Sequence, residues 1–425
     1  MKHDVKEVIL RNGARGLIIN VPDAPVVATQ FHFRAGERYA KEGKDQTAHI
    51  MEHMAFGANA EYANAHAFDE DFTKNGAYNN AWTTDYSMCY VAECAGFEWD
   101  RILNLQRLTI CSPKFIADEF TAEMGNVKSE LTGYLNEPNR VLWPKIGQEL
   151  GEKTLTISEK IDSLSNITLP DIRAHYRATH TAENMRFVVA GDFDRKESQL
   201  TRILNNFDLD SGERLSIPVD EIHSFEPFAI RRKDVSNITF GLTINLSRRI
   251  SDSEATAMSC LDHILNGTLH GLILGTARKR GLLYDIWSIT SRYEHNSSWD
   301  FGAEVNIDKI DELFDIIARE LTKIKKGELD EKFVEASKLY ALGRHQMSNQ
   351  TVGQLSRWYG QRYFFDGSTD SFENSLERIE RLSTKQIIAA AKEFFDANTW
   401  GIGIYGSVDK TIAERLHAKL RGIFE

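Results

Sequence analysis

Hydrophobic residues recur along the chain with two different spacings. Continuous or alternating apolar runs such as Met185–Gly191 and Trp400–Gly406 are bounded by turn residues, and this pattern predicts strands. Apolar residues three and four positions apart predict helices. The long helices predicted in this way lie around residues 47–56, 98–108, 118–135, 253–265 and 310–326. Because strands and helices alternate in both halves of the chain, the pattern predicts an α+β fold.

The two halves of the chain also resemble each other. Residues 161–194 and 379–409 both run from a Leu-Ser pair through an amphipathic helix to a strand that ends in Gly-x-x-Asp. This repeat is too long for a solenoid, so we interpret it as the internal duplication of one domain. The alternative is two unrelated α+β domains, which would share the same helix-then-strand order. Duplication predicts two homologous α/β sandwich-like domains, each a mostly antiparallel sheet covered by helices.

The boundary between the two domains is predicted in a polar segment that contains proline, residues 208–228. We expect an N-terminal domain over residues 1–212, a linker over 213–228 and a C-terminal domain over 229–425.

Composition narrows the possible partners and surroundings. The 425 residues are 42% hydrophobic and carry a net charge of -11, so no overall attraction to nucleic acid or to an anionic membrane is expected. The basic runs at residues 277–281 and 323–328 are interpreted as solvated helix faces or ends. No apolar run approaches the roughly 18–20 residues of a membrane span. The four cysteines form no CxxC pair, and a reducing, cytoplasmic setting is expected.

The segment TAHIMEHMAFG, Thr47–Gly57, carries the first sign of chemistry. If it is helical, His49 and His53 share one face and can bind one ion, and Zn²⁺ accepts neutral imidazole. Glu52 would lie beside them, where a carboxylate can accept the proton of an attacking water. The alternative is a polar patch on an ordinary helix surface.

A third ligand is needed, and a carboxylate is the usual complement to two histidines in a hydrolytic zinc site. Glu123 and Glu130 are two helical turns apart in the predicted helix 118–135 and so share a face. The alternative is a solvated acidic stripe that includes Glu119, and spacing alone does not decide between them.

Taken together, these motifs resemble the inverzincin metallopeptidases, the family of pitrilysin, insulin-degrading enzyme and the mitochondrial processing peptidase. In that family H-x-x-E-H is followed at a set distance by a third zinc-binding glutamate, and this distance falls on Glu130. A supporting glutamate two turns earlier falls on Glu123. The resemblance implies one Zn²⁺ per chain, held by His49, His53 and Glu130. It covers nearly the whole chain and points to the short, two-domain branch of the family.

Further segments fit the same family. Residues 75–90 resemble the edge strand that binds the main chain of the substrate by strand addition, which assigns substrate binding to Asn80 and Ala81. Residues 271–288 resemble the helix and loop whose tyrosine, here Tyr284, helps to stabilise the tetrahedral intermediate. The arginine that the family commonly places seven residues before this tyrosine is replaced by Ala277, and Arg278 stands one position later.

The resemblance predicts a zinc-dependent endopeptidase that cleaves peptides or unfolded polypeptide segments inside a closed chamber, with Glu52 as general base. It also implies a homodimer, with a heterodimer as the alternative. Two other functions stay open. One is a non-catalytic or partner-dependent subunit, which the missing arginine favours weakly. The other is a structural zinc protein, which two histidines and one glutamate favour poorly because they leave a coordination position open.

Overall fold

The computed structural model describes every residue except Asp234. The described chain forms two compact units, and each unit contains its own β-sheet. Unit 1 comprises Met1–Gly133, Ile157–Pro218 and Met347–Thr369, and unit 2 comprises Tyr134–Thr156, Val219–Gln346 and Asp370–Glu425. No helix formed by the described residues is long and apolar enough to cross a membrane.

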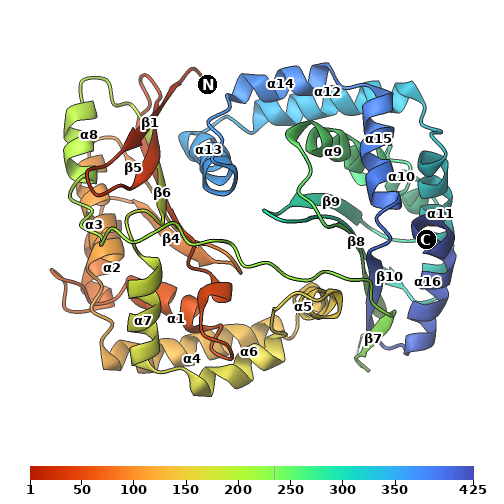
Figure 1. Ribbon diagram of the computed structural model, residues 1–425, viewed down its shortest axis with the longest axis horizontal. Helices are drawn as coiled ribbons and strands as arrows, with labels where there is room; N and C mark the ends of the chain where they lie inside the picture. The colour runs from red at the N-terminus through yellow and green to blue at the C-terminus, as the bar shows by residue number, and fades with distance from the viewer. Residues whose placement is uncertain (234) are drawn as a thin grey trace. The chain divides into compact units, whose positions relative to one another are not determined.

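The sheet of unit 1 has six strands in the order β1-β2-β6-β3-β5-β4. Figure 1 labels β1, β4, β5 and β6 of this sheet. Only β2 and β6 pair in parallel, and the other neighbours are antiparallel. The strands are β1 (Asp4–Ile9), β2 (Arg15–Asn20), β3 (Val26–Phe33), β4 (Tyr78–Thr83), β5 (Met88–Ala95) and β6 (Met185–Gly191).

The sheet of unit 2 has five strands in the order β7-β11-β8-β10-β9, and only the pair β7-β11 is parallel. The strands are β7 (Phe228–Arg231), β8 (Asn237–Leu246), β9 (Ile286–Arg292), β10 (Ser297–Asn306) and β11 (Trp400–Gly406). Strand for strand, this order and polarity repeat β2-β6-β3-β5-β4 of unit 1. Two mostly antiparallel sheets covered by helices confirm the predicted fold class, and the shared topology is what a duplication produces.

Helices cover both faces of the first sheet. The side chains of Thr29 and Gln30 point to opposite faces because neighbouring residues of a strand alternate. Thr29 Oγ1 donates to Gln106 Oε1 of α3 (Trp99–Cys111), at 2.5 Å. Gln30 Nε2 donates to Ser356 Oγ of α13 (Val352–Asp366), at 3.3 Å. The sheet is therefore buried between α3 on one face and α13 on the other.

The remaining helices of unit 1 surround these layers. They are α1 (Thr47–Ala55), α2 (Ala65–Thr73), α4 (Ala117–Tyr134), α6 (Ile157–Ser163), α7 (Leu169–Thr179) and α8 (Glu197–Leu204), with short 3₁₀ turns at Glu37–Tyr39 and Leu164–Asn166.

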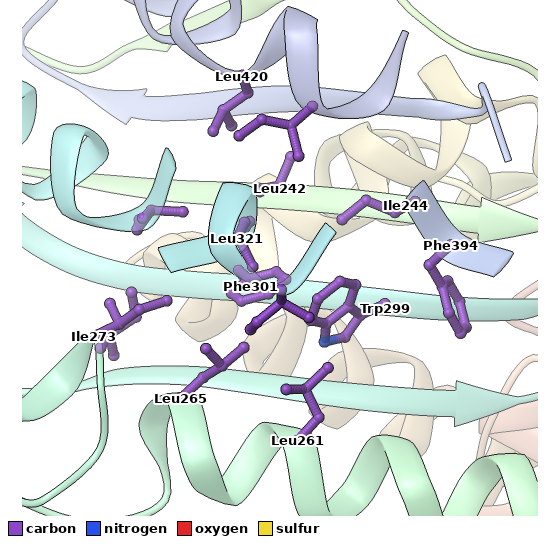
Figure 2. Close-up of a cluster of buried hydrophobic side chains, with 14 of the residues drawn as sticks. Leu242, Ile244, Leu261, Leu265, Ile273, Trp299, Phe301, Leu321, Phe394 and Leu420 are labelled. Carbon is purple, nitrogen blue, oxygen red and sulfur yellow. The ribbon is translucent and has the colours of Figure 1, made fainter. Parts of the chain in front are cut away.

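The core of unit 2 lies between one face of its sheet and a group of helices (Figure 2). Leu261 on α9 (Asp252–Asn266) and Phe301 on β10 are fully buried there, and each contributes roughly 1.5–3 kcal/mol by leaving water. The other helices of unit 2 are α5 (Pro138–Leu150), α10 (Leu274–Lys279), α11 (Ile310–Lys325), α12 (Glu331–Met347), α14 (Phe372–Glu380), α15 (Thr384–Phe395) and α16 (Lys410–Phe424).

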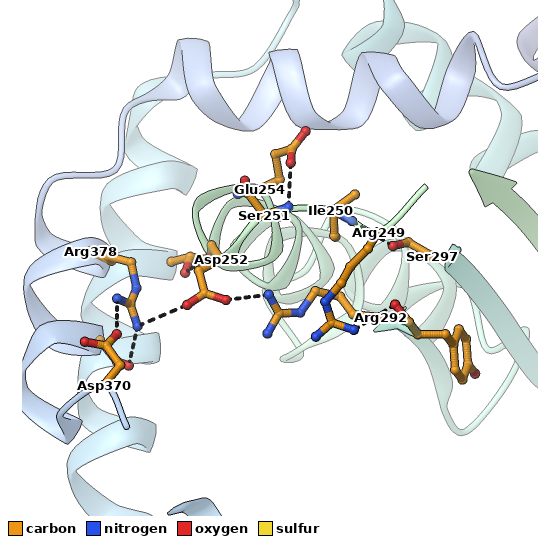
Figure 3. A network of polar contacts seen from close by, with 12 residues as sticks. Arg249, Ile250, Ser251, Asp252, Glu254, Arg292, Ser297, Asp370 and Arg378 are labelled. Carbon is orange, nitrogen blue, oxygen red and sulfur yellow. Dashed lines mark hydrogen bonds and ion pairs between the residues drawn. The ribbon is translucent and has the colours of Figure 1, made fainter. Parts of the chain in front are cut away.

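A polar network fixes the start of α9 (Figure 3). Ser251 and Glu254 form a reciprocal capping box, which satisfies two backbone N–H groups that the helix leaves unpaired. Asp252 accepts from Arg292 of β9 and lies 4.0 Å from Arg378 of α14. These contacts join the helix to the edge strand and to a helix much later in the chain.

The two units are discontinuous in sequence because each includes one helix from the other half of the chain. The first-half helix α5 packs on β8 and β11, where Ile146 and Trp143 lie over Gly241. The second-half helix α13 packs on β3 and β6, where His32 stacks on Phe364 at 5.1 Å between ring centroids. The main-chain passage from unit 1 to unit 2 after Pro218 falls inside the predicted linker 213–228.

Candidate metal centre and active site

The predicted metal helix is α1, and its two histidines lie on one face. The ring centroids of His49 and His53 are 4.9 Å apart. The opposite side of the helix is apolar, and Ile50, Met51 and Met54 are buried. The helix is therefore anchored in the core of unit 1 through these side chains, while both imidazoles stay partly exposed.

Helix α4 brings the third donor to this face. Glu130 Oε2 lies 3.6 Å from His49 Nε2 and 3.7 Å from His53 Nε2. One ligand atom from each of these residues lies within 4.8 Å of the other two. Tetrahedral Zn²⁺ with ligand bonds of about 2.1 Å needs donor atoms about 3.4 Å apart. Two imidazole nitrogens and one carboxylate oxygen at these distances fit a zinc ion and leave one coordination position open.

Each histidine is oriented through its other ring nitrogen. His53 Nδ1 lies 3.0 Å from Glu123 Oε2, which also accepts from Asn126 Nδ2 at 3.2 Å. His49 Nδ1 lies 3.1 Å from Gln46 Oε1. A proton on each Nδ1, donated to these oxygens, leaves the lone pair on Nε2, the atom that faces Glu130. The sequence-predicted supporting residue Glu123 therefore contacts a ligand directly.

Behind Gln46 the network reaches a partly buried ion pair. Gln46 Nε2 donates to Glu37 Oε1 at 2.7 Å, and Lys160 of α6 donates to Glu37 at 2.6 Å. Burial lowers the pKa of His49, with the nearby His53 as the second cause, while Glu130 and Glu37 oppose the shift. The imidazole of His49 is therefore held in its neutral form, which is the form that binds metal.

Glu52 is buried beside the two histidines, with 8% of its surface exposed. Thr83 Oγ1 of β4 donates to Glu52 Oε2 at 2.7 Å. Burial raises the pKa of Glu52, and the Thr83 hydrogen bond and His53 oppose the shift only in part. A carboxylate with increased proton affinity next to a metal site suits a general base.

Strand β4 ends the sheet next to this helix. Among the described strands it pairs with β5 alone, so its other edge is free. Thr84 N donates to Ser87 O, and because bonded and non-bonded pairs alternate from there, Ala81 directs its backbone groups to the free edge. Asn80 Oδ1 accepts from Ala81 N at 2.9 Å. The side chain of Asn80 thus binds the N–H group that Ala81 directs to the free edge.

Helix α4 also holds the segment that follows α1. Glu119 accepts hydrogen bonds from Ala58 N at 2.9 Å and from Ala65 N at 3.1 Å. A Cβ atom at Gly57 would lie 2.3 Å from Glu119 Oε2, so glycine is needed there for this approach. The alternative interpretation of the sequence placed Glu119 in a solvated acidic stripe. In the structure its carboxylate instead binds the backbone just after α1 and at the start of α2.

Tyr284 and Arg278 belong to unit 2. The Arg278 guanidinium lies 4.6 Å from the centre of the Tyr284 ring and donates to Tyr284 O at 2.7 Å. Tyr284 is 82% exposed, and Ala277 is fully buried. Arg278, in the last turn of α10, and Tyr284, in the segment between α10 and β9, therefore contact each other within unit 2. Their role at the metal centre stays a prediction.

Three residues of the site were not predicted from the sequence. Gln46 precedes His49 by three positions, so helical spacing was a usable signal. Glu37 comes from the 3₁₀ turn Glu37–Tyr39 and Thr83 from β4, and only the folded chain brings them to α1.

Comparisons with known proteins identify the family of the chain. The profile of Insulinase (Peptidase family M16) matches residues 15–154, and that of the Peptidase M16 inactive domain matches residues 166–339. An uncharacterized zinc protease of Rickettsia felis is 24% identical over 408 residues, which cover 94% of this chain and 97% of the relative. A zinc protease of Helicobacter pylori is 23% identical over 430 residues, with 93% and 90% covered.

Solved structures share the fold. A protease from Helicobacter pylori superposes with a TM-score of 0.85 at 18% identity, over 95% of this chain and 100% of that one. A Peptidase M16 inactive domain structure from Pseudomonas fluorescens gives 0.83 at 16% identity, over 95% and 98%. The metal helix lies in the part matched by the first profile, and the two profiles together span most of the chain. The chain therefore belongs to the insulinase family of peptidases, family M16.

Proposed function

We propose that the chain is a zinc-dependent endopeptidase that cleaves peptides or unfolded polypeptide segments. The observation that carries this proposal is the approach of His49, His53 and Glu130 to one point, with the buried carboxylate of Glu52 beside them. His49, His53 and Glu130 would hold the metal. When bound, zinc supplies Lewis-acid polarisation of the scissile carbonyl and lowers the pKa of a coordinated water.

Glu52 moves the proton in this reaction. Its Oε2 is held by the Thr83 hydroxyl, which leaves Oε1 to accept the proton of the attacking water. The raised pKa helps the same carboxyl group to hold that proton and to pass it to the leaving amine.

The substrate main chain is proposed to add to the free edge of β4. The N–H of Ala81 becomes available when the Asn80 side chain turns away from it, and an extended peptide can then pair as a further strand. Only an extended segment can pair in this way, which supports peptides and unfolded segments as substrates. Tyr284, with Arg278 beside it, is proposed to stabilise the oxyanion.

The experiment that tests the proposal is Glu52→Gln. We expect hydrolysis of an unstructured peptide to fall by at least roughly 10²-fold, the lower end of what general-base catalysis contributes, with the zinc content unchanged. Glu183→Gln, an exposed carboxylate outside the site, is the matched control. If Glu52→Gln keeps its zinc and still cleaves the peptide at the wild-type rate, the proposed role is wrong.

The second candidate is a partner-dependent subunit. It is supported by the alanine at position 277 and by the contacts that hold Arg278 of α10 against Tyr284 of the same unit. Peptide hydrolysis by the purified chain alone separates the two functions, because a subunit that depends on a partner stays inactive.

The enclosing chamber and the homodimer, or a heterodimer, remain predictions. Light scattering during gel filtration measures the assembly. Zinc removal by a chelator that abolishes hydrolysis without unfolding the chain would argue against a structural zinc protein.

A further inference from the structure

A cavity of about 290 Å³ lies on the face of the first sheet that α13 covers, next to the free edge of β4. Tyr78 and Trp82 of β4 contribute aromatic walls. Glu93 of β5 and Gly353 and Arg357 of α13 also line it. All of these residues belong to unit 1.

Glu93 is placed in this pocket without a charge partner. It is exposed, and among the described residues it takes part in no ion pair and no side-chain hydrogen bond. Gly353 makes room for it, because a Cβ atom there would lie 2.2 Å from Glu93 Oε1. Glu93 is cross-strand to Tyr78, so the carboxylate and this ring lie at the same end of the pocket.

The lining favours a cation over an anion at this end. A carboxylate attracts a positive charge directly, and the faces of Tyr78 and Trp82 attract it through their π-electrons. Arg357 is the opposing group, and it lies one helical turn beyond Gly353, about 6 Å further along α13. A basic side chain therefore fits the Glu93 end and is repelled from the other.

The alternation of β-strands connects the pocket with the edge of β4. The side chains of Tyr78 and Trp82 face the pocket, whereas Thr83 faces Glu52 on the opposite side of the sheet. Residues of an added strand share the face of the residue directly opposite them. Every second substrate residue would thus face the pocket, and those between would face the metal helix.

The distance suits a long side chain. An added strand would lie two strand spacings from β5, about 10 Å. A lysine or arginine side chain and the side chain of Glu93, extended toward each other, can bridge this gap.

We infer that this pocket is a subsite for a basic side chain of the substrate, with Glu93 as its ion-pair partner and Tyr78 and Trp82 as its aromatic walls. The inference rests on the proposed function, because strand addition to β4 is what brings a substrate residue here. It predicts that lysine or arginine is favoured at one fixed position, set away from the scissile bond along the edge strand.

The test measures binding separately from cleavage. Zinc-loaded Glu52→Gln protein is titrated with labelled alanine–threonine peptides that carry one lysine, glutamine or glutamate at each position in turn. We expect the lysine peptide to bind about two- to fivefold tighter than the glutamine peptide at one position, the size that a partly exposed ion pair supports. Adding Glu93→Gln should bring this ratio to one, and Glu93→Lys should make the glutamate peptide the tighter one.

Glu183→Gln serves as the control and should keep the lysine preference. A preference that Glu93→Gln leaves unchanged, or no lysine preference at any position, overturns the inference. Cleavage of the same peptides by the wild-type chain tests the proposed function separately. If cleavage depends on Glu52 but Glu93 has no effect, the proposed function stands and the subsite is rejected. If lysine binding depends on Glu93 but no peptide is cleaved, the subsite stands and the proposed function is rejected.

Discussion

The hydrogen bond from His53 Nδ1 to Glu123 gives the sharpest prediction about the metal centre. Replacing Glu123 by alanine removes the acceptor that fixes both the tautomer and the ring angle of a ligand. A hydrogen bond to a charged group contributes about 1.5–3 kcal/mol, and loss of such a partner lowers metal affinity about 10–100-fold. The two magnitudes agree, because a tenfold change in affinity corresponds to about 1.4 kcal/mol of binding free energy. The side chains of His53 and Glu123 are 25% and 24% exposed, so solvent screening favours the lower end of this range.

The partner of the other histidine supplies an internal comparison. Gln46 is neutral, and its hydrogen bond to His49 Nδ1 contributes about 0.5–1.5 kcal/mol. Gln46→Ala should therefore weaken zinc binding about 2- to 10-fold, less than Glu123→Ala does. The order of the two effects tests the charge of the acceptor, because both substitutions remove one orienting side chain.

The assay is a competitive zinc titration against a chromophoric chelator at one fixed pH, since metal affinity changes with pH. Asp118→Asn, an exposed acid on the same helix α4, is the matched control and should leave the affinity unchanged. The reasoning is refuted if Glu123→Ala stays within twofold of the wild type, or if Gln46→Ala has the larger effect.

Two further predictions concern stability. Glu119→Ala removes the acceptor of the Ala58 and Ala65 amides and should cost about 1–3 kcal/mol, with faster hydrogen exchange in residues 57–65, while Glu119→Gln keeps an acceptor and should cost less. In unit 2, burial raises the pKa of Asp262 to about 6, so its folded pKa lies above the unfolded value of about 3.9. Protonated Asp262 therefore contributes about 2–3 kcal/mol to the free energy of unfolding below about pH 4, and this contribution is lost as the pH rises through 6. Urea titrations should show that the stability of Asp262→Asn rises relative to that of the wild type over this pH interval. If the free energies of unfolding of the two proteins change in parallel with pH, the raised pKa of Asp262 is wrong.

The sequence predicts contacts between residues that are close along the chain better than contacts between residues that are distant along it. The metal helix was predictable because His49 and His53 are related by local helical geometry. Glu130 lies on a different helix, so periodicity placed it on a face but left the solvated stripe open, and only the family spacing joined it to the histidines. Glu37 and Thr83 reach α1 through the folding of a 3₁₀ turn and a strand, for which a single sequence contains no periodic signal.

The same limit on prediction from sequence applies to two whole helices, α5 and α13, each of which packs in the unit formed mainly by the other half of the chain. The apolar positions of α5 and α13 predict that each helix has a buried face. They do not specify which sheet that face covers, because a helix with one apolar face can be buried against either sheet. Contacts such as His32 with Phe364, and Gly241 with Ile146, decide it in the folded chain.

The duplication extends from the sheets to the hydrogen bond that orients Glu52, the proposed general base. Chain order makes α9 the counterpart of α1 and β9 the counterpart of β4. Asp262 and His263 of α9 repeat the Glu52–His53 pair, and Asp262 Oδ2 accepts from Thr290 of β9 as Glu52 accepts from Thr83.

The copy in unit 2 nevertheless lacks the rest of the metal site. Ser259 stands four residues before His263, where a second histidine would be needed, and the described residues contain one group of potential metal ligands, at His49, His53 and Glu130. Asp262 instead accepts from the buried Trp299 Nε1, and burial raises its pKa as it raises that of Glu52. The buried carboxylate of Glu52 is thus the proposed proton acceptor in unit 1, whereas the equivalent carboxylate of Asp262 in unit 2 lowers the stability of the fold as the pH rises.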